Sequence, residues 1–92
     1  MGSYAAKKDN LSRLESHLRQ SVQQGAPRNL LLRLAEEVRL ARIRVLKAAK
    51  ATLVPKTGSQ LNQGVALAAK IALLETLPSE AILAEYSSPL KQ

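Results

Sequence analysis

One segment of the chain concentrates side chains that can bind phosphate groups. Between residues 26 and 58, eight basic residues stand against two acids, Glu36 and Glu37, so eight minus two gives this segment a net charge of +6. The eight basic residues are Arg28, Arg33, Arg39, Arg42, Arg44, Lys47, Lys50 and Lys56. The whole chain has a formal net charge of +7. A positive charge this localised is typical of a surface that binds a polyanion.

The spacing of these residues arranges them in rows if the segment is a helix. Eleven residues make almost three helical turns, so Arg28, Arg39 and Lys50 form one row and Arg33 and Arg44 form a second. Neighbours within a row are ~16 Å apart. The predicted phosphate-binding residues are Arg28, Arg33, Arg39, Arg44, Lys47 and Lys50. The alternative is an ordinary solvated helix face whose cations form local ion pairs with Glu36 and Glu37.

Apolar residues also occupy more than one side of this helix. The face opposite the basic rows carries a broad stripe of Leu, Val and Ala that predicts a core. Leu32, Leu40 and Ile43 instead lie among the arginines. A helix that is apolar on two sides contacts two neighbours, and a second copy of the chain is a natural partner. Arg42 projects near the core stripe, so we expect either that its head reaches water or that it pairs with Glu75 or Glu80.

The elements that position these residues can be read from helix periodicity and from Gly and Pro. The pattern predicts helices over residues 4–24, 27–53 and 59–76, with the third beginning at Ser59 or Asn62, and a short fourth over 79–86. A shorter first helix, capped by Asp9 or Asn10, is the alternative. Gly25 and Pro27 separate the first two helices, and Pro55 ends the second. Residues 1–86 thus form one all-α domain, and 87–92 form a tail.

The composition supports this fold class and excludes several chemistries. Apolar residues make up 46% of the chain but aromatic ones only 2%, which favours helices packed through aliphatic side chains. The chain has no cysteine, so no disulfide or thiolate site is expected, and a reducing compartment such as the cytoplasm is consistent with that. His17 is the single histidine, and no triad, paired-carboxylate site or phosphate loop is present. We therefore predict no enzyme, metal or cofactor, and no membrane insertion.

The scarcity of aromatic residues indicates which nucleic acid such a helix would bind. Proteins that bind single strands stack bases on aromatic side chains, and this chain offers only Tyr4 and Tyr86. No pair of short helices typical of a helix-turn-helix occurs around residues 26–58. A long basic helix without aromatics suits contact with phosphates and 2′-hydroxyls along double-stranded RNA. Double-stranded DNA remains an alternative.

A short segment and the order of elements resemble a known family. Residues 24–29 read Gln-Gly-Ala-Pro-Arg-Asn and are similar to the Gln-x-Ala-Pro-x-Asn turn of the RNA-silencing suppressors of insect nodaviruses. The resemblance implies an antiparallel, dimeric four-helix-type bundle that lies along double-stranded RNA in the host cytoplasm and shields it. It assigns RNA contact first to Arg39, Lys47 and Lys50, then to Arg33 and Arg44. The long helix ends about one turn early for that family, and residues 65–74 are richer in Ala.

Two other functions compete with this prediction. Leu32, Leu40 and Ile43 among the arginines suit a protein-interaction module, such as a chaperone or adaptor, that binds an acidic amphipathic helix. Reversible attachment of a basic amphipathic helix to an anionic membrane surface is the third possibility. The bundle pattern of the other helices favours this third function least.

Overall fold

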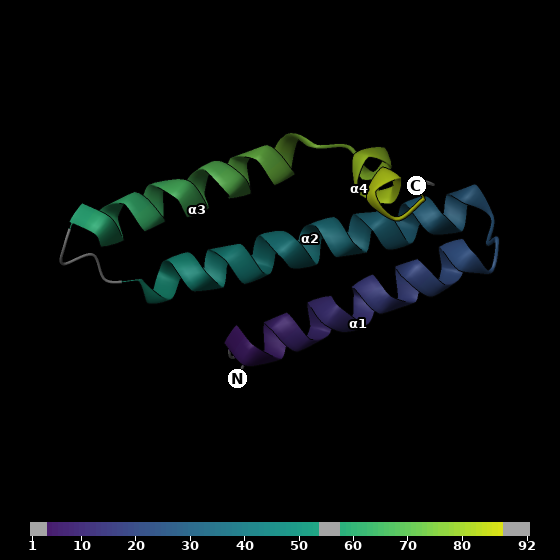
Figure 1. Cartoon of the computed structure of the whole chain (residues 1–92), viewed down its shortest axis with the longest axis horizontal. Coiled ribbons are helices and arrows are strands. Elements are labelled where there is room, and N and C mark those ends of the chain that lie inside the picture. The colour runs from purple at the N-terminus through teal and green to yellow at the C-terminus, as the bar shows by residue number, and fades with distance from the viewer. Residues whose placement is uncertain (1–3, 54–57, 88–92) are drawn as a thin grey trace.

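The computed structural model describes residues 4–53 and 58–87, which form four helices. They are α1 (Tyr4–Gln23), α2 (Arg28–Thr52), α3 (Gly58–Thr76) and α4 (Ser79–Ser87) (Figure 1). The described part of the chain contains no strand, which confirms the all-α prediction. The shorter alternative for the first helix was wrong, because α1 already begins at Tyr4. Ser87 closes α4 rather than opening a tail, and the rest of the predicted tail lies outside the described residues.

The turn between α1 and α2 uses the conformational freedom of glycine. Gly25 has φ 72°, a left-handed conformation that costs glycine little. The amide of Gly25 donates to the carbonyl of Val22 (3.1 Å), and that of Ala26 donates to Ser21 (3.0 Å). These bonds satisfy carbonyls at the end of α1. Pro27 then precedes α2, and its carbonyl accepts from the amide of Leu31 (3.0 Å). The predicted stop and start at this turn are confirmed.

Helix α2 is the middle element of the molecule. It packs against α1, α3 and α4, whereas α1 and α3 do not touch within the described residues. Figure 1 shows α1 and α3 on opposite sides of α2, with α4 lying across the end of the hairpin. The described core gathers where α1, α2 and α4 meet, and its buried members are Leu18, Leu34, Ala35, Val38, Ile82 and Leu83. A helix flanked in this way on two sides keeps an open flank between its neighbours.

The second apolar side of α2 is occupied by α3 of the same chain. Ile43, which the sequence places among the arginines, is buried, as is Ile71 of α3. Leu32 is half-buried and packs against the core cluster. Of the three apolar residues on that side, Leu40 is the one that stays exposed. The second neighbour that the pattern of α2 predicts is therefore α3, so α2 does not need another copy of the chain for that role.

Candidate nucleic-acid interface

Arg39, one of the three residues to which the resemblance first assigns RNA contact, is engaged within the chain. Its Nε and one terminal nitrogen donate to the two oxygens of Glu36 (2.9 and 2.6 Å), and the other terminal nitrogen donates to the carbonyl of Leu74 in α3 (2.9 Å). The Arg39 side chain is only 15% exposed. The Ser79 hydroxyl at the start of α4 also donates to Glu36 (2.7 Å). These contacts tie α2, α3 and α4 together, so we leave Arg39 out of the interface.

The ionisation of Glu36 reflects these bonds. The hydrogen bonds from Arg39, and after them the one from Ser79, lower the pKa of the Glu36 carboxyl from 4.5 to about 2. The same carboxylate raises the pKa of the Arg39 guanidinium. Both groups stay charged at neutral pH and neutralise each other. The alternative interpretation, in which cations of α2 form local ion pairs, therefore holds for Arg39 and Glu36.

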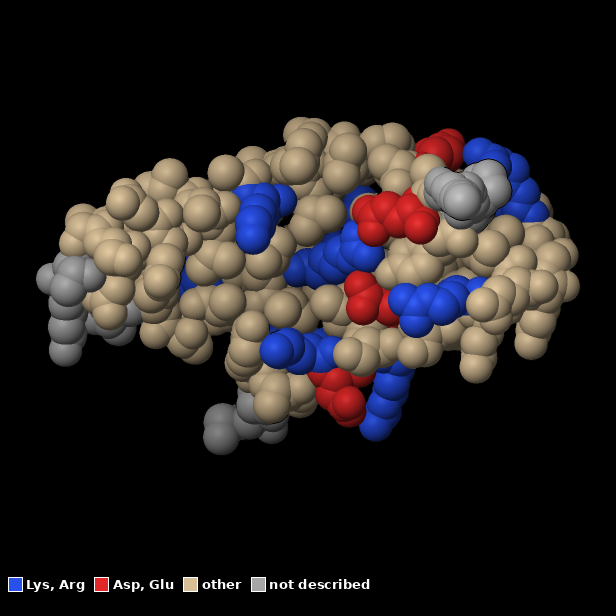
Figure 2. Space-filling model, viewed as in Figure 1, with Lys and Arg blue, Asp and Glu red and all other residues tan. Residues whose placement is uncertain are grey.

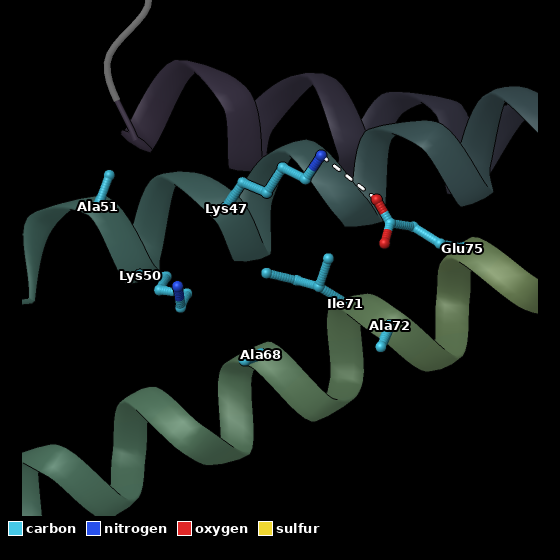
Figure 3. Close-up of a pocket in the computed structure, with 7 residues that line it drawn as sticks. All are labelled: Lys47, Lys50, Ala51, Ala68, Ile71, Ala72 and Glu75. Atoms are coloured by element: carbon cyan, nitrogen blue, oxygen red, sulfur yellow. Dashed lines mark ion pairs between the residues drawn. The ribbon is translucent and has the colours of Figure 1, made fainter.

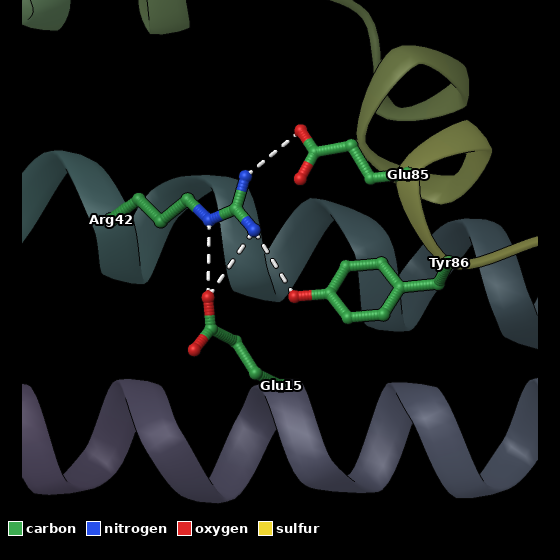
Figure 4. Close-up of polar contacts among 4 residues, drawn as sticks. All are labelled: Glu15, Arg42, Glu85 and Tyr86. Carbon is green, nitrogen blue, oxygen red and sulfur yellow. Dashed lines mark hydrogen bonds and ion pairs between the residues drawn. The ribbon is translucent and has the colours of Figure 1, made fainter.

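Arg42 forms a second internal cluster on the other flank of α2 (Figure 4). Its guanidinium donates to Glu15 of α1 (3.2 and 3.3 Å), to Glu85 of α4 (3.0 Å) and to the Tyr86 hydroxyl (3.1 Å). Burial disfavours the charged guanidinium, but Glu85 and then Glu15 outweigh that effect and raise the pKa of Arg42. Pairing with an acid was predicted, but the predicted partners, Glu75 and Glu80, were wrong. Sequence spacing could not show that α1 and α4 flank this residue.

Lys47 and Lys50 lie where α2 and α3 face each other near the end of α2 (Figure 3). The Lys47 ammonium is 3.4 Å from the Glu75 carboxylate, and both side chains are more than half exposed. An exposed pair of this kind contributes little and is readily exchanged for another anion. Lys50 is exposed and pairs with none of the described residues. Both lysines are therefore available to a phosphate.

Arg33 and Arg44 form the row whose side chains are exposed to solvent. Both residues are exposed, and neither forms an ion pair or side-chain hydrogen bond with a described residue. They are eleven residues apart and thus ~16 Å apart along α2. Arg28 is also exposed and unpaired within the described chain, but it belongs to the row that Arg39 interrupts. The structure therefore distinguishes the two predicted rows, because α3 engages Arg39, the middle residue of one row, and no residue of the other among those described.

Lys7 is a residue that the sequence analysis missed. The start of α1 and the end of α2 form a shallow hollow, and Tyr4, Lys7, Arg44 and Lys47 line it. The antiparallel hairpin brings Lys7 close to Arg44 although 37 positions separate them in the sequence. The signal was the short turn predicted at Gly25 and Pro27, since a short turn between two long helices places the start of the first beside the later part of the second. The hollow extends the basic surface from α2 onto α1.

The distribution of charge differs between the two flanks of α2. On the face drawn in Figure 2, basic and acidic side chains alternate across the middle of the molecule. Arg42 on α2 is paired with two carboxylates, those of Glu15 and Glu85. By contrast, Arg33 and Arg44 are unpaired within the described residues. We define the open flank of α2 as Arg33, Leu40, Arg44 and Lys47.

Other features of the described chain bear on the excluded chemistries. His17 is exposed on α1. No group of three or more His, Cys, Asp or Glu side chains within residues 4–53 and 58–87 is placed to hold a metal ion. Among the described helices, none combines the length and the apolar character needed to cross a lipid bilayer. The chain gives no significant match to protein-family models, to curated proteins or to solved structures.

Proposed function

We propose that this protein binds double-stranded nucleic acid, preferably RNA, without regard to base sequence, and shields the duplex. The observation that carries the proposal is the exposed pair Arg33 and Arg44, which no described carboxylate neutralises. Lys47 continues this surface toward the end of α2, and Lys50 lies beside it in the groove between α2 and α3. The resemblance to nodaviral suppressors of RNA silencing agrees with this reading, and a protein of that kind would act in the cytoplasm.

The geometry suits backbone contact rather than base reading. A rigid α-helix holds these four cations over a span of 17 residues, which is ~26 Å. A duplex carries closely spaced phosphates along its whole length, so each cation meets a phosphate whatever the sequence. Among the described aromatic residues, Tyr4 alone borders the open flank, through the hollow that it lines with Arg44 and Lys47, and one ring gives unpaired bases little on which to stack. The wide, shallow minor groove of double-stranded RNA, which phosphates flank, can therefore accommodate the open flank of α2. Occupying the duplex would deny it to processing enzymes.

The protein-interaction module remains the second prediction, and the fold weakens its basis. That reading relied on three apolar residues among the arginines of α2. Ile43 is buried and Leu32 is half-buried within this chain, which leaves Leu40 as the exposed one. One exposed leucine gives a partner helix little apolar area on this flank. The unpaired cations then determine what the open flank can bind, and we favour the polyanion.

A homodimer is part of the proposal. Two copies would extend the basic surface along one duplex, so that binding of the second copy gains from the first. Because α1 and α3 of the same chain cover two sides of α2, the contact between copies is not the one that the two apolar sides of α2 predict.

The experiment that tests the proposal compares two double variants of equal net charge. Arg33→Gln/Arg44→Gln removes two cations from the open flank, whereas Arg13→Gln/Lys70→Gln removes one exposed cation each from α1 and α3. In a gel-shift titration with duplex RNA, we expect the first variant to bind at least ~10-fold more weakly and the second to change by less than ~3-fold. Equal weakening by both would show that only net charge matters, and the open flank would then not be the site.

A further inference from the structure

An apolar groove runs between α2 and α3, beside the last turns of α2. Its two halves have volumes of about 370 and 350 Å³. Lys50 and Ala68 line both halves, so the halves form one continuous groove. We call it the interhelical groove. Its principal members are Lys47, Lys50, Leu53, Leu61, Val65 and Ala68.

The interhelical groove is open because small residues face each other across it. Ala51 of α2 and Ala68 and Ala72 of α3 line the half nearer the end of α3, and alanine fills little of the space between two helices. Within the described chain, Ile71 is the one residue of α3 that is buried, and its side chain points toward α2 (Figure 3). The earlier turns of α3 therefore leave space beside α2 that a ligand can fill.

The half nearer the start of α3 is suited to an alkyl chain. Leu53, Leu61 and Val65 line it, and none of the described residues that line it is acidic. Leu61 is 57% exposed and Val65 is 70% exposed. Covering these side chains with apolar atoms removes their surface from water, which is favourable.

Two lysines make the interhelical groove attractive to an anionic head group. Lys50 is exposed and pairs with none of the described residues. Lys47 is paired with the exposed carboxylate of Glu75 at 3.4 Å. Among the described residues these three are the charged ones that line the groove, so two lysines and one glutamate sum to +1. An anion can thus bind Lys50 directly and compete with Glu75 for Lys47.

We propose that the interhelical groove binds a single long-chain carboxylate, the anion of a free fatty acid. The carboxylate lies at Lys47 and Lys50, and the alkyl chain lies in the apolar half of the groove. From Ala72 to Leu61 the groove follows α3 for ~16 Å. An extended alkyl chain advances ~1.3 Å per carbon, so about twelve carbons match this length. This binding does not depend on nucleic acid.

The size of the interhelical groove favours a single chain over larger partners. A strip ~16 Å long and ~10 Å wide is far below the ~1,000 Å² of total buried area that a specific protein interface requires. A membrane surface requires an apolar face flanked by several cations, whereas Lys50 is the one described cation that lines the apolar half. The volume is instead that of a small-molecule site, which combines an apolar lining with a few polar groups.

Titration of the nitrogen-15-labelled protein with dodecanoate tests the proposal, without nucleic acid and below the concentration at which dodecanoate forms micelles. We expect saturable shifts of the amide signals of Gly64, Val65 and Ala68. The dissociation constant should be roughly 0.1–1 mM, since the ligand is small and the groove leaves one side of it in water. Decanoate should bind about 4-fold more weakly, because it lacks two methylene groups that the groove half covers. Dodecyltrimethylammonium, which has the same chain and a cationic head, should bind at least ~5-fold more weakly.

Matched variants test where the ligand lies. Ala68→Phe fills the interhelical groove where its halves meet, whereas Ala66→Phe puts the same ring at an exposed position of α3 outside the groove. We expect Ala68→Phe to weaken dodecanoate binding at least ~10-fold and Ala66→Phe to weaken it less than ~2-fold. Lys50→Gln should weaken it ~3-fold, and Lys70→Gln, which removes an exposed cation elsewhere on α3, should leave it unchanged. Equal helix content by circular dichroism establishes that the variants are folded.

Several results would overturn the proposal. These are the absence of saturable shifts up to ~2 mM dodecanoate, equal binding of dodecanoate and dodecyltrimethylammonium, and equal effects of the two phenylalanine variants. Binding to phosphatidylserine vesicles without binding to dissolved dodecanoate would assign the groove to a membrane surface and overturn it as well. Because the titrations contain no nucleic acid, each of these outcomes leaves duplex binding by α2 to its own test.

Discussion

The ion pair of Glu36 and Arg39 should contribute substantially to the stability of this small domain, and Glu36→Gln tests that contribution. The substitution keeps the side-chain size but removes the charge that Arg39 and Ser79 bind. It leaves a guanidinium that is only 15% exposed without its counter-charge. Each hydrogen bond to a charged group contributes about 1.5–3 kcal/mol when it is shielded from water. The Glu36 side chain is 38% exposed, which screens these interactions.

We therefore expect Glu36→Gln to lower the free energy of unfolding by about 2 kcal/mol at pH 7, or the melting temperature by about 8–16 °C. The pKa of Glu36 gives the sign of the pH dependence. A carboxyl whose pKa falls from 4.5 to about 2 on folding stabilises the protein above pH 4.5, and that stabilisation is lost as the pH falls toward 2. The difference between parent and variant should accordingly shrink to less than ~0.5 kcal/mol near pH 2.

Urea unfolding followed by circular dichroism measures this difference. Glu37→Gln is the matched control, because Glu37 is the adjacent acid, is exposed and pairs with no described residue. We expect Glu37→Gln to change the free energy of unfolding by less than ~0.5 kcal/mol. If the two variants lose the same stability, or if the difference does not depend on pH, the reasoning about the Glu36–Arg39 pair is refuted.

Three further substitutions test other parts of the fold by thermal unfolding. Arg42→Met should lower the free energy of unfolding by about 2 kcal/mol, because it leaves Glu15 and Glu85 without their partner. A decrease below ~0.5 kcal/mol would show that this cluster contributes little to stability. Gly25→Ala should lower the free energy of unfolding by about 1 kcal/mol, because the φ of 72° at this position is strained for any residue with a Cβ. An unchanged melting temperature would contradict the turn geometry. Gly64→Ala should raise the free energy of unfolding by up to ~1 kcal/mol, because alanine favours a helix more than glycine does. The added Cβ would lie 3.5 Å from Leu53 Cδ2, an ordinary contact distance, so a lower free energy of unfolding would contradict this packing.

The helices and their limits could be predicted because local signals determine them. Gly25 and Pro27 act through their own backbone geometry, and the apolar period of each segment is read within a few turns. The ends of α1 and α2 accordingly differ from the predicted ends by one residue each. The third helix begins at Gly58, ahead of both predicted starts. Helix ends vary by this much because the terminal turn is held by few hydrogen bonds.

The surface of α2 could be predicted only in part, because its availability depends on tertiary packing. Helical spacing correctly groups Arg39 and Arg44 into different rows, but it cannot tell which row a neighbouring helix covers. That choice depends on where α3 docks, and the Leu74 carbonyl that accepts from Arg39 belongs to α3. Arg42 shows the same dependence, since its partners Glu15 and Glu85 come from α1 and α4.

The most direct test of the central claim is the salt dependence of duplex binding by the parent protein. Fluorescence anisotropy would be measured with two duplex RNAs of unrelated sequence, a duplex DNA and a single strand. Four phosphate contacts, made by Arg33, Arg44, Lys47 and Lys50, predict a slope of log K against log salt of about −3.6 for each protomer, equal for both RNA sequences. Tighter binding of the single strand, or no duplex binding at about 50 mM salt, would contradict the claim that these four cations of α2 bind duplexes through their backbones.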